Sequence, residues 1–196
     1  MKSLVVNRKA ELRTRMIDDR SSLQPHRRRQ ADQSIGGHVL RLLDDRDELD
    51  IAGFLPFQGE PDLTPALKAL AGGGHRIWLP VIDGKSMAFR RWIPGQPLEP
   101  NRFGIPEPVA GAHCLPQQLE LVLTPLVAFS ATGNRLGMGA GFYDRSFAFA
   151  RAEPDAGPWM VGIAYALQQV DSLPVEPWDV PLGAVITERG LQVFRA

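Results

Sequence analysis

Cysteine is almost absent from this sequence, since Cys114 is the only one among 196 residues. A lone cysteine cannot form an internal disulfide, so the chain is not a disulfide-stapled secreted domain. Long apolar runs are also lacking. The opening MKSLVVNRKAELR offers too short an apolar run for a signal peptide, and no stretch approaches the ~18–20 apolar residues of a membrane span. These absences predict a protein that does not enter a membrane and works in the cytoplasm.

Net charge is lacking as well, because 22 Lys and Arg balance 22 Asp and Glu. A neutral chain is not expected to bind nucleic acid generally. The charges are nevertheless uneven, since residues 1–46 hold 11 basic and 6 acidic side chains, a net +5. Such a basic arm can bind RNA or attract a phosphorylated ligand. A solvated helix face explains most of these charges equally well.

Apolar periodicity predicts two basic helices at about 7–46, followed by an α/β body at about 50–196, in one domain spanning 1–196. The first helix has Leu12 and Met16 on one face. The second, starting at Gln24–Pro25, is expected to bury Ile35, Val39, Leu42 and Leu43. Further helices are expected at 63–74 and 142–152, strands at 51–57, 76–82, 87–93, 119–129, 159–165, 183–187 and 191–194, and an irregular segment at 94–118. Alternating strands and helices predict a largely parallel sheet covered on both faces.

Glycine is concentrated at residues 133–145, GNRLGMGAGFYDR, between an apolar strand pattern and a helix pattern. Gly137, Gly139 and Gly141 occupy alternate positions, where the absence of Cβ lets a ligand come close to the backbone. A helix start offers unpaired N–H groups to a phosphate, and Arg135 adds a full positive charge. The segment therefore predicts a phosphate site, although a simple glycine-rich turn remains the alternative.

Two common phosphate motifs are excluded at this loop. A dinucleotide-binding G-x-G-x-x-G would need glycine where Phe142 or Asp144 stands. A P-loop would need Gly-Lys-Ser/Thr, which the sequence does not contain. The expected phosphate site therefore belongs to another class.

Two carboxylates and two cations accompany the loop. Asp144 could hold Mg²⁺, which takes one or two carboxylates and completes its shell with water and phosphate, or it could only stabilise a helix start. Asp179 is a second candidate, with loop capping as its alternative. Lys9 and Arg13, four residues apart, lie on one helix face. Such pairs are usually solvated, but an anion site nearby makes them candidates for binding it.

At these residues the chain resembles the 5-formyltetrahydrofolate cyclo-ligase family. The resemblance runs over nearly the whole length. It rests on Lys9 and Arg13, on the segment 54–64 around Glu60, on Gly-Ile-Pro-Glu-Pro at 104–108, on Arg-Leu-Gly-Met-Gly-Ala-Gly-Phe-Tyr-Asp at 135–144, and on the late loop ending at Asp179. Ala140 and Phe142 depart from the residues that the family commonly carries there.

The resemblance implies a three-layer α/β/α fold shared with ribose-phosphate isomerases and CoA transferases. It also implies an ATP- and Mg²⁺-dependent ligase that converts 5-formyltetrahydrofolate to 5,10-methenyltetrahydrofolate and releases ADP and phosphate. The implied ATP-binding residues are Lys9, Arg13, Arg135, Leu136, Gly137, Met138, Gly139, Ala140, Gly141, Phe142 and Tyr143. The implied folate-binding residues are Leu55, Glu60, Met138, Gly139, Ala140, Gly141 and Phe142. Arg135 and Asp144 are the implied catalytic residues, and Asp144 and Asp179 the implied metal ligands.

The implied chemistry asks for charge and positioning more than for a nucleophile. ATP phosphorylates the formyl oxygen, N10 closes the ring, and phosphate leaves, so the protein must align the γ-phosphate and neutralise its charge. Cys114 and His113 are accordingly expected to be non-catalytic. Glu60 is expected to accept hydrogen bonds from the pterin, because Asp62 or Thr64 can cap the following helix. Phe142, Tyr143 and Trp92 are candidates for stacking on the pterin.

Two other functions remain open at this point. An enzyme of the same fold could act on another phosphorylated metabolite or on a CoA ester, with Glu107 as an imaginable thioester-forming nucleophile. A non-enzymatic RNA-binding or regulatory protein could use the basic arm, and would show salt-sensitive affinity. We expect the protein to bind ATP and 5-formyltetrahydrofolate, and to bind neither nucleic acid nor a membrane. We also expect it to be a monomer.

Overall fold

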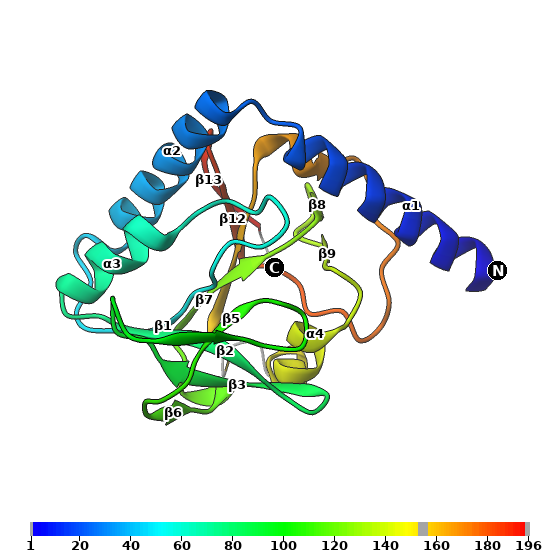
Figure 1. Ribbon diagram of the computed structural model, residues 1–196. Coiled ribbons are helices and arrows are strands. Elements are labelled where there is room, and N and C mark those ends of the chain that lie inside the picture. Colours follow the sequence, from blue (N-terminus) through cyan, green and yellow to red (C-terminus); the bar gives the residue numbers. More distant parts are fainter. Residues whose placement is uncertain (1, 153–156, 195–196) are drawn as a thin grey trace.

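The computed structural model describes residues 2–152 and 157–194. Its centre is an eight-stranded sheet in the order β13-β12-β10-β7-β1-β2-β3-β6 (Figure 1). The strands are β1 (Asp50–Ala52), β2 (Arg76–Asp83), β3 (Ser86–Arg91), β6 (His113–Cys114), β7 (Leu121–Pro125), β10 (Trp159–Ile163), β12 (Ala184–Thr187) and β13 (Gly190–Val193). Strands β12, β10, β7, β1 and β2 run parallel, whereas β13 pairs antiparallel with β12 at one edge, and β3 and β6 follow β2 by antiparallel pairing at the other.

Helices cover both faces of this sheet (Figure 1). On one face α2 (Pro25–Leu43) contacts α3 (Thr64–Gly72) and β12, and on the other α4 (Phe142–Ser146) contacts β3 and α5 (Ala148–Ala152). The sequence-predicted α/β class, with a largely parallel sheet between helical layers, is confirmed. No helix in the described part of the chain is both long and apolar enough to cross a membrane.

The first helix, α1 (Lys2–Ser21), lies away from the main sheet (Figure 1). It contacts β8 (Ala128–Ser130) and the short 3-10 turn η3 (Ala166–Gln168). Strand β8 pairs with β9 (Arg135–Leu136) and β11 (Gln169–Val170) in a second, three-stranded sheet. The helix with the predicted cations thus packs beside the strands that lead into the glycine-rich loop.

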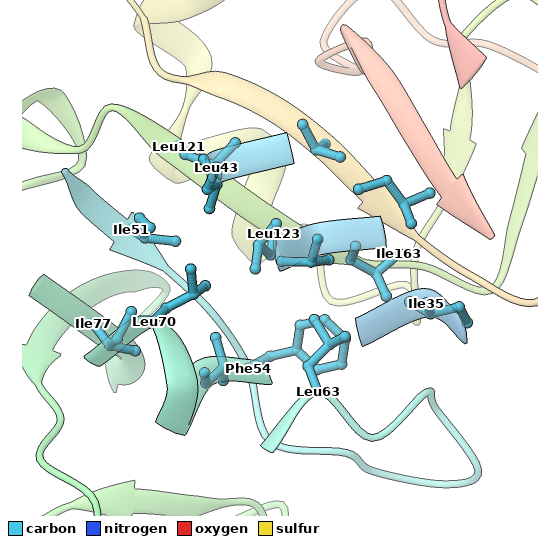
Figure 2. Close-up of a cluster of buried hydrophobic side chains, with 14 of the residues drawn as sticks. Ile35, Leu43, Ile51, Phe54, Leu63, Leu70, Ile77, Leu121, Leu123 and Ile163 are labelled. Atoms are coloured by element: carbon cyan, nitrogen blue, oxygen red, sulfur yellow. The ribbon is translucent and has the colours of Figure 1, made fainter. Parts of the chain in front are cut away.

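Two apolar clusters form the core on the two faces of the main sheet, and a third, smaller cluster joins Met16 of α1 to Val127, Ala128 and Leu136. Figure 2 shows the cluster between the sheet and α2 and α3. Its members include Ile35, Leu43, Ile51, Phe54, Leu63, Leu70, Ile77, Leu121, Leu123 and Ile163. Strand residues alternate between the clusters, so Ile51 faces α2 and α3 while Ala52 joins the opposite cluster. This two-sided burial explains why the central strands are apolar throughout.

Three predicted elements are shorter or divided in the structure. The strand expected at 51–57 ends at Ala52, before Pro56, which has no N–H for a ladder. The strand expected at 119–129 divides into β7 and β8, because the carbonyls of Leu126 and Val127 accept side-chain donors and not strand partners. The helix expected at 142–152 divides at Phe147, which is fully buried.

Two smaller differences concern the periphery. Leu42 is only partly buried, unlike Ile35, Val39 and Leu43. The segment 94–118 is more ordered than expected. It contains β4 (Leu98–Pro100) paired with β5 (Pro106–Pro108), then β6 and the 3-10 turn η1 (Pro116–Gln118).

Candidate functional site

A cavity of about 510 Å³ opens beyond the carboxyl ends of β1, β2 and β7. Ligands of open α/β sheets commonly bind at this end of the strands. The cavity is also lined by α1, by the glycine-rich loop and by the segment 101–107. The predicted site residues that line it are Lys9, Arg13, Leu55, Glu60, Arg135, Leu136, Gly137, Met138, Gly139, Ala140, Gly141, Phe142, Tyr143, Asp144 and Asp179. Residues far apart in sequence therefore share one cavity.

The glycine-rich loop needs its glycines at two positions in particular. Gly139 and Gly141 have φ values of +100° and +67°, a backbone region that residues other than glycine rarely occupy. A Cβ at Gly139 would lie 3.3 Å from Cζ of Arg13. The Nε–H of Arg13 donates to the carbonyl of Gly137 over 2.8 Å, so the guanidinium from α1 supports the loop from beneath.

The helix that follows this loop is short, since α4 covers only Phe142–Ser146. A helix of little more than one turn contributes a smaller dipole than the long helix expected from the sequence. Side chains therefore carry a larger share of the positive charge at the loop than the sequence indicated. Burial lowers the pKa of Arg13, an effect that the Asp179 carboxylate opposes.

Arg135 and Asp144 form an ion pair at the wall of the cavity. Nη2 of Arg135 donates to Oδ1 of Asp144 over 2.7 Å, and Nη1 donates to the carbonyl of Val180. The backbone N–H of Val180 donates to the same Oδ1 over 3.1 Å. Oδ2 of Asp144 accepts no hydrogen bond from the described residues, and it is the oxygen available to a ligand. The Arg135 side chain is only 4% exposed, so its ion pair with Asp144 is largely shielded from solvent on the arginine side.

Asp179 is held in the loop before Val180. Its Oδ2 accepts the N–H of Glu176 over 2.9 Å, which is the loop-capping role considered for it. The same oxygen lies 3.7 Å from Nζ of Lys9, and a Glu176 oxygen lies 4.0 Å away. Asp179 therefore caps its own loop and also lines the cavity.

The two carboxylates do not form a complete protein cage for a metal. Within residues 2–152 and 157–194 there is no group of three or more His, Cys, Asp or Glu placed to hold an ion. Mg²⁺ that arrives with a nucleotide needs only one or two protein carboxylates, because phosphate and water supply the remaining ligands. Asp144 and Asp179 on one cavity wall fit that kind of site.

Glu60 lines the cavity from the loop after β1, and its side chain is 8% exposed. Its Oε2 accepts the N–H of Phe57 over 3.1 Å, and its Oε1 lies 3.7 Å from Nη2 of Arg20. Burial raises the pKa of Glu60 to about 7, against the opposing effects of Arg20 and the Phe57 N–H. Asp62 accepts the N–H of Thr64 at the start of α3 over 2.9 Å, so Glu60 is not needed as a cap.

Of the three aromatic residues expected to stack on the pterin, Phe142 and Tyr143 line the cavity and Trp92 does not. Trp92 was a wrong candidate, because it is buried in the core and does not line the cavity. Phe103 lines it instead, 45% exposed and edge-on to Phe142 at 5.9 Å between ring centroids. The Arg145 guanidinium lies 5.3 Å from the Phe142 ring centroid. Tyr143 stacks on Phe147 at 6.2 Å.

Sequence reasoning missed Phe103 and also Trp178, a 59% exposed residue of the cavity wall. Phe103 immediately precedes the Gly104–Pro108 motif, and Trp178 immediately precedes Asp179. An aromatic residue beside a recognised motif was the available signal for both. The sequence alone could not show that these two aromatic side chains are exposed at a cavity.

Two residues considered for covalent chemistry are placed unfavourably for it. Cys114 is buried outside the cavity lining, and burial raises its pKa to about 11. Glu107 does line the cavity, but its Oε1 accepts both the N–H of Ile82 over 3.0 Å and an amide N–H of Asn101 over 2.6 Å. These bonds give Glu107 a structural function in holding the segment 101–107.

Comparison with known proteins agrees with this architecture. A model of the 5-formyltetrahydrofolate cyclo-ligase family matches residues 5–188. The 5-formyltetrahydrofolate cyclo-ligase of Haemophilus influenzae is 37% identical, over 89% of this chain and 95% of its own length. That of Escherichia coli strain K12 is 41% identical, over 70% of this chain and 76% of its own. The NMR structure of Aquifex aeolicus 5,10-methenyltetrahydrofolate synthetase superposes with a TM-score of 0.82, at 31% identity, over 96% of this chain and 93% of that one.

Proposed function

The chain belongs to the 5-formyltetrahydrofolate cyclo-ligase family and converts 5-formyltetrahydrofolate to 5,10-methenyltetrahydrofolate with ATP; we propose that the cavity at the carboxyl ends of β1, β2 and β7 is its active site. In this proposal the nucleotide phosphates lie between α1 and the glycine-rich loop. The folate lies between Glu60 and the Phe103–Phe142 pair. The supporting observation is that one cavity is lined by Lys9, Arg13 and Arg135 together with Glu60.

The reaction explains why the site is rich in fixed charges. The formyl oxygen is a poor leaving group until it attacks the γ-phosphorus and displaces ADP. N10 then adds to the activated formyl carbon, and the former formyl oxygen departs as phosphate while N10 loses its proton. No protein atom forms a covalent bond in this sequence, so the protein acts by alignment and by stabilising charge on the transferred phosphoryl group.

Each cation of the site has its own part in this proposal. Lys9 and Arg13 contact phosphate oxygens from α1, and Arg13 keeps the loop backbone in place through Gly137. Arg135 fixes Asp144, whose Oδ2 faces no protein donor among the described residues. Mg²⁺ held by Asp144 and Asp179 would neutralise phosphate charge and orient the nucleotide.

The remaining assignments extend from the same reading. We expect a monomer in the cytoplasm that has no nucleic-acid or membrane partner. The zero net charge fits the absence of a nucleic-acid partner, and the single, buried Cys114 fits a reducing compartment. Size-exclusion chromatography coupled to light scattering measures the oligomeric state directly.

The direct test mixes the purified protein with MgATP and 5-formyltetrahydrofolate and follows the absorbance of the methenyl product. Product should form only when both substrates are present, and ADP should appear in a 1:1 ratio to it. ATP hydrolysis without methenyl product would assign the cavity to a different acceptor. Omission of Mg²⁺, with chelator present, should abolish turnover and tests the metal separately.

We expect the α1 cations to act on the nucleotide and not on the folate. Lys9→Ala and Arg13→Ala should each raise the KM for ATP by ~10-fold, the scale of one lost charge-assisted hydrogen bond. The KM for 5-formyltetrahydrofolate should stay within about twofold, as steady-state titrations of each substrate would show. Arg15→Ala is the matched control, because Arg15 is exposed on the same helix and does not line the cavity. A rise confined to the folate KM would place α1 at the wrong substrate.

We also expect Phe142 to act through its ring alone. Phe142→Tyr should be nearly silent, whereas Phe142→Ala and Phe103→Ala should each raise the folate KM by ~5–10-fold, consistent with ~0.5–1.5 kcal/mol for an aromatic contact. Phe149→Ala is the control, since Phe149 packs on Phe147 outside the cavity lining and should affect stability and not KM. Unchanged folate KM in both cavity variants would remove this pair from the folate site.

A further inference from the structure

Arg20, at the end of α1, is the largest fully buried side chain of the described residues, with 0% exposure. Its Nε–H donates to the carbonyl of Gln58 over 2.9 Å. Nη1 donates to the carbonyl of Leu126 over 3.0 Å, and Nη2 to that of Phe57 over 3.4 Å. All three guanidinium nitrogens are therefore engaged, and two of their acceptors belong to the loop that carries Glu60.

The loop held by Arg20 has an unusual backbone. Gln58 has a φ of +46°, the only positive value found for a residue other than glycine in the described chain, and Gly59 follows with +77°. Two left-handed residues in succession turn the chain sharply and are unfavourable for a side-chain-bearing residue such as Gln58. The carbonyls of Phe57 and Gln58 converge on the Arg20 guanidinium, which stabilises this turn.

Arg28 strengthens the same junction from α2. Its Nη2 donates to the carbonyls of Arg20 and Ser21 over 2.6 and 3.2 Å, which ties down the end of α1. A Cβ at Gly59 would lie 3.0 Å from Oγ of Ser21 and 3.4 Å from Nη1 of Arg28. The Glu60 loop is thus packed directly on the end of α1.

The charge of Arg20 has one partner. Glu60 is the only carboxylate within 4.0 Å of it in the described structure, at 3.7 Å. The remaining acceptors of Arg20 are neutral carbonyls, and a buried cation needs a countercharge. Conversely, Glu60 receives only one hydrogen bond from the described residues, the Phe57 N–H. Tyr143, from α4, is the other titratable group whose charge state couples to Glu60.

We propose that Arg20 is a positioning residue for the folate: it fixes the Phe57–Glu60 turn and supplies the countercharge that favours an ionised Glu60 carboxylate at the cavity. This inference rests on the proposed function, because it assumes that Glu60 accepts hydrogen bonds from the folate. In this arrangement α1 contributes to the binding of both substrates. Lys9 and Arg13 contact the nucleotide, and Arg20 on the same helix fixes the Phe57–Glu60 turn that faces the folate.

The test compares wild type, Arg20→Lys, Glu60→Gln and the double variant Arg20→Gln/Glu60→Gln. The kcat/KM for 5-formyltetrahydrofolate and the KM for ATP are measured from pH 6 to pH 9. Lysine keeps the charge, but its single ammonium nitrogen cannot reach the three carbonyls that the three guanidinium nitrogens contact, so Arg20→Lys should lower the folate kcat/KM by ~10-fold. Its pH midpoint should move upward, because a less well placed cation stabilises the carboxylate less. The KM for ATP should change less than about twofold.

The double variant separates positioning from mere folding support. It removes both buried charges together, so neither is left without a partner as Arg20 is in Glu60→Gln, and we expect it to fold. If Arg20 acts through Glu60, the double variant should match Glu60→Gln within about threefold in folate kcat/KM. A larger additional loss would overturn the proposal.

Two further outcomes are decisive. An Arg20→Lys variant with equal losses toward ATP and folate and an unmoved pH midpoint would show a purely structural role and overturn the inference. Arg28→Lys is the control for loosening the helix end without changing the charge beside Glu60, and its pH midpoint should equal that of wild type. If wild type itself forms no methenyl product, the proposed function fails, and that result is read from the wild-type arm alone.

Discussion

Replacing Asp144 by asparagine is expected to lower kcat by ~10²-fold or more, the scale of losing one group that stabilises transition-state charge. Asparagine has the same shape, and its amide oxygen can still accept the bonds from Arg135 and the N–H of Val180 that now end on Oδ1. The cavity wall should therefore keep its structure. What is lost is the negative charge, including the share on Oδ2 that we assign to Mg²⁺.

The measurement is a steady-state rate at saturating MgATP, repeated over a range of Mg²⁺ concentrations. The apparent Mg²⁺ requirement should rise in Asp144→Asn, and thermal unfolding should confirm an intact fold. Asp179→Asn is a useful comparison, because Asp179 also caps its own loop at Glu176 and faces Lys9. Near-normal turnover of Asp144→Asn at saturating MgATP would exclude the assigned role.

The glycine-rich loop shows how far local sequence reaches. Its alternating glycines and flanking Arg135 and Asp144 predicted a loop open to a ligand, and the loop does line the cavity. The helix after it was predicted too long, because the apolar spacing of Phe142, Phe147 and Phe149 is compatible with one continuous helix. Phe147 packs between Phe89 and Tyr143, and the helix divides there.

Tertiary contacts account for what the sequence did not indicate. In the sequence Trp92 is an aromatic residue near the end of a predicted strand, and only the packing of its neighbours shows that it belongs to the core. Arg20 reads as one more charge on a basic helix, with a solvated side chain as the expected outcome. Its burial depends on carbonyls supplied by residues 57, 58 and 126, which are 37 to 106 positions away in the chain. No local pattern encodes such a meeting.

Glu60→Gln is expected to lower the folate kcat/KM by ~10–100-fold at pH 8. The carboxylate is an acceptor for donors on the pterin, and a charge-assisted hydrogen bond contributes about 1.5–3 kcal/mol. Glutamine keeps an acceptor oxygen but adds an N–H₂ group that faces the same donors, so it is nearly isosteric and wrong in polarity. The KM for ATP should change little, because Lys9 and Arg13 are untouched.

The difference between wild type and Glu60→Gln should increase with rising pH. Burial raises the pKa of Glu60 to about 7, so the accepting, ionised form predominates only above that pH. The wild-type folate kcat/KM should therefore rise as pH increases through about 7 and level off above it, whereas that of Glu60→Gln should lack this step. The advantage of wild type over the variant should shrink from pH 8 to pH 6, since protonated Glu60 loses its charge as glutamine does. Titration of the nucleotide is common to both proteins and cancels in their ratio. A ratio that stays constant from pH 6 to pH 8, or a variant with unchanged folate kcat/KM, would leave Glu60 with only its contacts to Phe57 and Arg20.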